Sequence, residues 1–205
     1  MKVIAVNGSP RPDGNTATGL NIMCEVLNAH GIETEVLQIG AKGIHGCTGC
    51  GGCRSQPGGK CVIDDVVNQH ADKIAAADGV IFGSPVYYAG MAGDMKSYMD
   101  RLFFSAAKRF KYKVAAGMVA VRRSGGTVTA DQFARYFNIA GVLVAPSCYW
   151  NIVHGDQKGE ALQDEEGVDT LKTVAENMAW LLRVLDETKV PLPEIPARRK
   201  TNFVR

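Results

Sequence analysis

The amino-acid sequence predicts an α/β fold, a doubly wound, five-stranded parallel sheet with helices on both faces. Three observations predict it. Five short runs are almost continuously apolar, which is typical of strands buried on both faces of a sheet. Between these runs lie stretches whose apolar residues recur at helical spacing. The chain has 205 residues, enough for one such domain with a well-buried core.

The first strand is expected at Lys2–Asn7, where the apolar run KVIAVN ends in turn residues. Glu33–Ile39 and Gly79–Gly83 follow as the second and third strands. The fourth and fifth are expected at Val114–Val121 and Val142–Ala145. Right-handed crossovers between parallel strands favour the order 2-1-3-4-5, with ligand sites beyond the carboxyl ends of the strands.

Five helices are expected between and after these strands. The first is Asn15–His30, which carries an apolar stripe. The second begins at Asp64, whose side chain can cap the first turn. The third is indicated by apolar residues at helical spacing between positions 95 and 103. The last two are expected at Ala130–Ala140 and Glu165–Leu185.

The chain is expected to form one domain over residues 1–188, with a cysteine-rich loop at 47–61, followed by a proline-rich basic tail at 189–205. Its 23 basic and 21 acidic residues nearly balance, so neither nucleic acid nor an anionic membrane is an expected partner. The apolar run in MKVIAVNGS is too short for a signal peptide. A cytoplasmic location is therefore expected, where thiols stay reduced.

The loop after the first strand reads GSPRPDGNTAT, residues 8–18. It has neither the Gly-Lys-Ser/Thr of a nucleoside-triphosphate loop nor the G-x-G-x-x-G of a dinucleotide fold. Ser9, Asn15 and Thr16 surround a turn that opens a helix, where free N–H groups favour a phosphate. The alternative is an ordinary turn in which Asn15 or Thr16 only caps the helix.

A second loop, SPVYYAGMAGDMK at residues 84–96, follows the third strand. In the strand order 2-1-3-4-5 the first and third strands are neighbours, so both loops border one crevice. Tyr87 and Tyr88 offer flat aromatic faces, and the peptides of 84–90 can read the edge of a heterocycle. Together with a phosphate anchor, this slot suits flavin mononucleotide (FMN). The alternative for the tyrosines is ordinary packing.

A third loop, RRSGG at residues 122–126, leaves the fourth strand at the same end of the sheet. Arg122 or Arg123 there can place positive charge near the flavin or meet the phosphate of a nicotinamide cofactor. The alternative is that both arginines are simply solvated.

Four of the six cysteines, Cys47, Cys50, Cys53 and Cys61, follow the spacing C-x2-C-x2-C-x7-C. Closely spaced thiolates with a later fourth ligand suit an iron-sulfur cluster. Three alternatives stay open, namely tetrahedral zinc, a redox disulfide between Cys47 and Cys50, and a loop without metal. Cys24 lies on the apolar stripe of the first helix and is expected in the core.

Four stretches together resemble the flavodoxin-like, NAD(P)H-dependent FMN reductases, and within them the iron-sulfur flavoproteins. They are GSPRPDGNT at 8–16, CTGCGGC with Cys61 at 47–61, SPVYYAGMAGDMKSYMDR at 84–101 and AVRRSGG at 120–126. The resemblance extends over residues 1–185 and leaves the tail outside.

The resemblance implies a flavodoxin-like fold, a homodimer or homotetramer, and a [4Fe–4S] cluster held by the four cysteines. It implies that the FMN phosphate is bound by Ser9, Arg11, Asn15 and Thr16. The implied contacts of the ring are Pro85, Val86, Tyr87, Tyr88 and Gly90. From the third loop, Arg122 and Gly125 are also expected to bind the cofactor.

The expected function is an FMN-dependent oxidoreductase whose electron donor is NAD(P)H or a reduced, ferredoxin-like carrier protein. No catalytic side chain is expected, because the flavin carries the chemistry. Two alternatives remain. One is an electron-transfer flavoprotein without substrate turnover, and the other is a non-catalytic sensor of redox state or metal.

Overall fold

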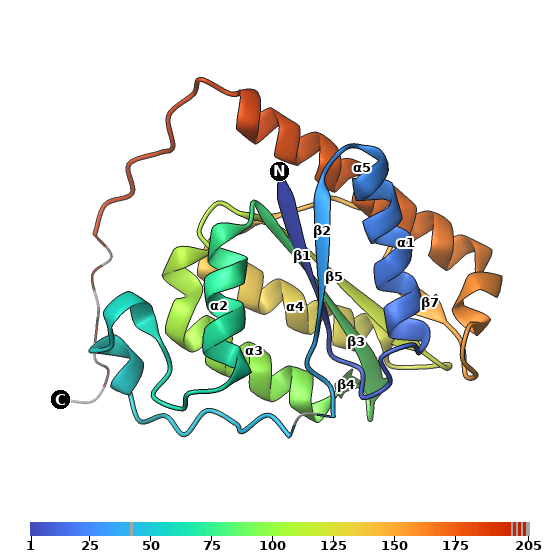
Figure 1. Cartoon of the computed structure of the whole chain (residues 1–205), viewed down its shortest axis with the longest axis horizontal. Coiled ribbons are helices and arrows are strands. Elements are labelled where there is room, and N and C mark those ends of the chain that lie inside the picture. Colours follow the sequence, from blue (N-terminus) through green and yellow to red (C-terminus); the bar gives the residue numbers. More distant parts are fainter. Residues whose placement is uncertain (42, 198, 200, 202, 204–205) are drawn as a thin grey trace.

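The computed structural model describes residues 1–41, 43–197, 199, 201 and 203. Its centre is a parallel sheet in the order β2-β1-β3-β5-β6 (Figure 1). The strands, in that order, span Glu33–Gln38, Lys2–Asn7, Gly79–Tyr87, Val114–Val121 and Leu143–Val144. This confirms five parallel strands in the predicted order 2-1-3-4-5, since β5 and β6 are the fourth and fifth of them.

The three inner strands of the sheet are parallel and end at the same edge, but β3 and β5 extend further than β1. Asn7 at the end of β1 pairs with Gly83 in β3, and Gly83 pairs with Met118 in β5. The segments that leave these strands therefore all start at the carboxyl edge of the sheet. This is where ligand sites of doubly wound sheets form.

Two short strands were not predicted. β4 (Gly90–Met91) runs antiparallel to the end of β3, and β7 (Ile152–His154) pairs in parallel with β5. The fifth strand, expected at Val142–Ala145, is thus only the first part of this edge. Pro146 cannot donate to a ladder, and the chain leaves the sheet after it before β7 resumes the pairing.

Helices cover both faces of the sheet (Figure 1). α1 (Asn15–Ala29) and α5 (Glu165–Glu187) pack on one face. α2 (Val66–Ala76), α3 (Gly93–Ala106) and α4 (Gly126–Ala140) pack on the other. Alternate residues of β1 enter the two cores, as expected for a strand buried on both sides. Cys24 lies in the core beneath α1, as expected.

The helices α1 and α5 end within two residues of their predicted ends, whereas the starts of α2 and α4 differ from the prediction for identifiable reasons. Asp65, not Asp64, caps α2, because its carboxylate accepts a hydrogen bond from Val67 N–H. α4 begins at Gly126, four residues before the predicted start, because Gly125 turns the chain sharply at its N-cap. Four short 3₁₀ turns complete the structure, at Gly52–Arg54, Pro57–Gly59, Ala107–Arg109 and Glu160–Gln163.

Beyond α5, the described residues of the tail form neither helix nor strand. Arg198, Lys200, Asn202, Val204 and Arg205, which belong to the predicted tail, lie outside the described residues. Among the helices that the structure describes, none combines the length and the apolar character that crossing a membrane requires.

Candidate functional site

The three predicted loops meet at the carboxyl edge of the sheet. Gly8 N–H donates to the carbonyl of Gly83 at 2.9 Å, which joins the start of the first loop to β3, just before the second loop. The third loop lies against the second, because a Cβ added to Gly125 would stand 2.9 Å from Cα of Ala89. The order of the strands predicts that the loops are neighbours, and the second of these contacts shows that the second and third loops touch.

The first loop is held from within by polar side chains. Ser9 is buried, and its hydroxyl accepts a hydrogen bond from Arg11 N–H at 3.1 Å. The carbonyl of Ser9 accepts a bond from the Gln38 amide at 2.6 Å, and Asn7 bonds the same amide group. Arg11 itself is exposed. The N-cap residue of α1, Gly14, makes no side-chain hydrogen bond, so no side chain of the cap occupies the first N–H groups of the helix.

Asn15 is engaged on the far side of this loop. Its side-chain NH₂ donates to the carbonyl of Gln157 at 2.9 Å. Its side-chain oxygen accepts from Gly159 N–H at 3.1 Å and from Ala161 N–H at 3.2 Å. The amide therefore ties α1 to the turn before α5. Because the side chain of Asn15 is engaged elsewhere, a phosphate bound at this loop would meet the backbone N–H of Asn15 and the buried residue Thr16.

The second loop is a tight hairpin between β3 and β4. Tyr88 and Ala89 form its turn with φ of 49° and 56°, the left-handed conformation of a two-residue hairpin loop. The buried Ser84 hydroxyl accepts from Ala92 N–H at 3.1 Å and closes the base. Pro85, Val86 and Gly90 are partly buried. Tyr87 is 48% exposed and Tyr88 is fully exposed, so neither ring is consumed by the core.

In the third loop, Gly125 has a φ of 89° and caps α4. A side chain there would also collide with the hairpin, so the position favours glycine twice over. Arg122 is largely exposed, and its Nε lies 3.7 Å from the carboxylate of Asp156. The guanidinium of Arg122 therefore lies toward Asp156.

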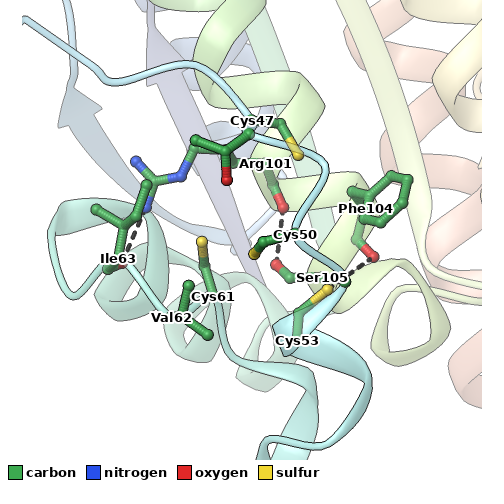
Figure 2. A pocket seen from close by; sticks show the side chains of 11 residues that line it. Cys47, Cys50, Cys53, Cys61, Val62, Ile63, Arg101, Phe104 and Ser105 are labelled. Atoms are coloured by element: carbon green, nitrogen blue, oxygen red, sulfur yellow. Dashed lines mark hydrogen bonds between the residues drawn. The ribbon is translucent and has the colours of Figure 1, made fainter.

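The four cysteines Cys47, Cys50, Cys53 and Cys61 line one hollow together with residues of α3 (Figure 2). All are free thiols. Gly51, with φ of 71°, turns the chain between the second and third cysteines. Among the described residues, no three His, Cys, Asp or Glu side chains lie close enough to hold a single metal ion. The hollow thus gathers the thiols without closing them into a tight mononuclear site.

Polar contacts act on two of the four cysteines, Cys50 and Cys61. The pKa of the Cys50 thiol is lowered because the Gly52 N–H and the Thr48 hydroxyl donate to its sulfur. The Asn68 amide from α2 holds the backbone of Cys61 on both sides, accepting from its N–H at 2.8 Å and donating to its carbonyl at 2.9 Å. The last of the four cysteines is therefore fixed to a helix.

Arg101 is a site residue that the sequence analysis missed. It lies on α3, lines the hollow and is 1% exposed. Its guanidinium donates twice to Asp65, at 2.5 and 2.9 Å, once to the carbonyl of Ile63 at 2.9 Å and once to that of His45 at 3.3 Å. The sequence feature that could have revealed it is the position of Arg101 on the apolar face of α3, beside Tyr98 and Leu102. A cation on such a face requires buried partners.

The cysteine hollow and the hairpin open onto one groove. This groove runs between α3 and α4 and has a volume of about 720 Å³. Cys47 and Gly90 both line it, and the aromatic side chains of Phe103, Phe104 and Tyr136 form much of its wall. Ile44 N–H donates to Asp94 at 3.1 Å, which fixes the segment before Cys47 to the start of α3.

A doubly wound sheet with an uncapped helix start, an aromatic hairpin and a glycine-turned loop at one edge defines a flavodoxin-like protein. A sequence model of the family described as NADPH-dependent FMN reductase matches residues 1–157. The chain belongs to this family, in its branch of iron-sulfur flavoproteins, and is thereby an FMN-dependent oxidoreductase.

Two relatives support this assignment, and one solved structure supports the fold. An iron-sulfur flavoprotein of Methanocaldococcus jannaschii is 34% identical over 196 residues, which cover 90% of this chain and 99% of that protein. An iron-sulfur flavoprotein of Methanosarcina thermophila is 29% identical over 199 residues, covering 92% and 99%. A solved flavodoxin from the domain Archaea superposes with a TM-score of 0.59 at 16% identity, over 89% of this chain and 99% of that one. The last confirms the flavodoxin-like fold.

Proposed function

We propose that this oxidoreductase binds FMN at the three-loop edge, takes electrons from NAD(P)H and passes them singly to a [4Fe–4S] cluster on Cys47, Cys50, Cys53 and Cys61. When bound, the flavin supplies hydride acceptance and the cluster supplies one-electron transfer. The work of the chain is to bind both groups, to orient them and to exclude water.

The residues at the start of α1 fit a phosphate. The first N–H groups of the helix are left without a side-chain cap, and an anion there is favoured by the helix dipole. Thr16 is buried in the first turn, and the hydroxyl of Ser9 keeps a proton to donate while it accepts from Arg11. The exposed Arg11 can close over the ligand from the solvent side. Asn15 contributes through its backbone, because its side chain holds the 157–161 turn.

The hairpin fits an isoalloxazine ring. Pro85, Val86 and Gly90 offer partly buried backbone and apolar surface at the end of β3. Tyr87 and Tyr88 offer exposed rings, which gain by covering a flat ligand. Gly125 allows the third loop to approach the hairpin closely. Arg122 is free to swing from Asp156, since their separation of 3.7 Å at the surface is a weak attraction.

The cysteine hollow fits a cluster better than a single ion. In a cubane cluster each cysteine binds a different iron, so its ligands stand farther apart than those around zinc. The four thiols share one hollow, and none of the described residues forms a closer group for one ion. A redox disulfide and a loop without metal are the rival interpretations, and both predict a preparation without iron.

One observation carries the proposed electron path: Cys47 lines both the cysteine hollow and the groove that reaches Gly90 of the hairpin. A flavin held on the hairpin would therefore lie on the same groove, and in the same subunit, as the thiol that begins the cysteine segment. The groove volume of about 720 Å³ lies within the range of small-ligand sites, so a small electron donor or acceptor can enter it. Cys47 and Cys50 are exposed, which also leaves the hollow open to a ferredoxin-like carrier protein.

The test follows both centres during reduction. Protein purified without oxygen is mixed with NADPH or NADH in a stopped-flow instrument, and the flavin bands and the broad iron-sulfur absorbance are recorded separately. We expect the flavin to be reduced first and the cluster afterwards, with faster reduction by one nucleotide. Cys53→Ala is expected to lose iron and keep the flavin, whereas Cys148→Ala, an exposed cysteine outside the hollow, keeps both.

Two outcomes contradict the proposal. If neither nucleotide reduces the flavin and a reduced ferredoxin does, the protein is an electron carrier without turnover of NAD(P)H. If Cys53→Ala retains all the iron of the unmodified protein, the iron is not held by the cysteine hollow.

A further inference from the structure

We propose that Arg101 is a ligand-contacting residue of the cysteine site, whose Nε–H donates a hydrogen bond to a sulfur of the bound cluster. The inference rests on the proposed function, because it requires that the hollow hold a cluster. It adds a residue from outside the cysteine motif and assigns it a chemical role.

Arg101 joins the two ends of the cysteine segment, residues 45–63, through hydrogen bonds to its backbone. Its Nη1 binds the carbonyl of His45, two residues before Cys47, and its Nη2 binds the carbonyl of Ile63, two residues after Cys61. Both nitrogens also bind the carboxylate of Asp65. One side chain of α3 thus fixes the separation between the entry and exit of the segment that carries all four thiols.

The remaining donor of this guanidinium is left without a well-placed acceptor. Nε of Arg101 is buried and makes no hydrogen bond of ordinary geometry with any described residue. The side chain lines the hollow beside the four cysteines, as Figure 2 shows, and it has a weaker hydrogen-bonding and electrostatic interaction with the Cys61 thiol. A buried donor without a well-placed acceptor is costly, so its presence beside four sulfurs indicates an acceptor that arrives with the ligand.

The acceptor that fits is sulfur. Thiolates and the inorganic sulfides of a cluster accept hydrogen bonds, and such bonds, together with nearby positive charge, raise the reduction potential of the cluster. Asp65 already balances Arg101 on its Nη side, so the cation is stabilised in place before any cluster binds. The Nε side is then the part of the side chain that is left for the ligand.

A purely structural role is the competing interpretation, and the choice of variants separates the two. Arg101→Lys keeps a cation but removes Nε and the fork, whereas Arg101→Gln removes the charge as well. Asp65→Asn retains Nε and removes the counter-ion on the Nη side of Arg101. Arg183→Gln, which removes an arginine that donates to the carbonyl of His30 on the opposite face, is the matched control.

Each variant is reconstituted anaerobically with iron and sulfide, and three quantities are measured: FMN content, iron and sulfide content, and the reduction potential of the cluster. The flavin potential in the same sample serves as internal reference. We expect Arg101→Lys and Arg101→Gln to bind FMN normally, to hold the cluster about tenfold more weakly and to shift its potential to more negative values. Asp65→Asn leaves the charge of Arg101 unbalanced and should shift the potential in the opposite direction, to more positive values. Arg183→Gln should keep the potential of the unmodified protein.

An unchanged cluster potential in Arg101→Lys overturns the assignment of Nε, even where the loading falls. This variant decides the matter if Arg101→Gln does not fold. A failure of the proposed function looks different, since the unmodified protein then takes up no iron or sulfide under the same conditions, and both proposals fall together.

Discussion

The carboxylate of Asp65 accepts two hydrogen bonds from Arg101, at 2.5 and 2.9 Å. The same carboxylate accepts a hydrogen bond from Val67 N–H and thereby caps α2. A single acidic side chain thus connects the start of α2, the middle of α3 and the end of the cysteine segment. The Arg101 side chain is fully buried and that of Asp65 is 29% exposed, so the pair lies at the boundary of the core.

Asp65→Asn is expected to lower the free energy of unfolding at neutral pH by about 3 kcal/mol, because it leaves the buried charge of Arg101 without its counter-ion. Burial raises the pKa of Asp65, but Arg101 and Val67 N–H outweigh it and hold the pKa below its usual value. The stabilisation is therefore complete above the unfolded pKa of about 4 and is lost as the pH falls through the folded one.

Urea unfolding at about pH 7 and about pH 3 measures this difference. The gap between the native protein and Asp65→Asn should narrow at the lower pH, as the native carboxylate takes up its proton. Asp169→Asn removes an exposed carboxylate, paired with Lys172 at 3.7 Å, and should change stability by less than about 0.5 kcal/mol. A gap of equal size at both pH values would show that the carboxylate charge is not what Arg101 requires.

Asn15→Ala is expected to lower the free energy of unfolding by about 2 kcal/mol, because three hydrogen bonds to the 157–161 turn are lost. FMN affinity should fall by less than about tenfold, since we propose that this residue contacts the phosphate through its backbone. Urea unfolding and a fluorescence titration with FMN measure the two effects. Asn177→Ala, which removes one bond to Pro146, should cost about 1 kcal/mol and leave FMN binding unchanged.

Gly125→Ala is expected to weaken FMN binding. The left-handed φ alone costs about 1–2 kcal/mol for alanine, and the contact at 2.9 Å with Ala89 forces the hairpin to shift. Gly31→Ala is a matched control, because φ there is 74° and no atom lies within 4 Å of the added Cβ. Both variants should lose similar backbone stability, but only Gly125→Ala should lose FMN affinity, by about tenfold. If a titration gives the two variants equal FMN affinities, the contact between Gly125 and the hairpin does not contribute to the flavin site.

Tyr88→Ala is expected to leave the stability of the protein without FMN within about 0.5 kcal/mol of the native value, because the ring is fully exposed. FMN affinity should fall by about 1 kcal/mol, since the ring gains contact only when the flavin is present. The control is Trp180→Ala, which removes an exposed aromatic ring on α5 and should change neither the stability nor the FMN affinity. If Tyr88→Ala binds FMN as tightly as the native protein, the wall of the ring site is formed elsewhere.

The fold was predictable because its signals are local. β5 spans Val114–Val121 as predicted, since an apolar run bounded by polar residues marks a strand buried on both sides. The edge strand was not predictable in full. Ile152–His154 is too short to carry a pattern, and it joins β5 only because the sheet is already there. The choice of Asp65 over Asp64 as the α2 cap likewise depends on Arg101, 36 residues away.

The site was predictable as a set of loops but not as a set of contacts. The crossover rule alone places the loops after β1, β3 and β5 at one edge, and the structure confirms that the third loop touches the second and that the first loop starts against β3. The engagement of Asn15 depends on partners 142 to 146 positions away, which no local pattern reveals. The roles of the predicted flavin and cluster residues remain predictions.

The most direct test of the account is an ultraviolet–visible spectrum of protein purified without oxygen, with iron, sulfide and zinc assays on the same sample. The account predicts flavin bands on a broad iron-sulfur absorbance, with iron and sulfide in near-stoichiometric amounts and no zinc. Flavin without iron would contradict the assignment of the four cysteines and leave an FMN reductase. No flavin after addition of FMN would contradict the central claim that the three loops form an FMN site.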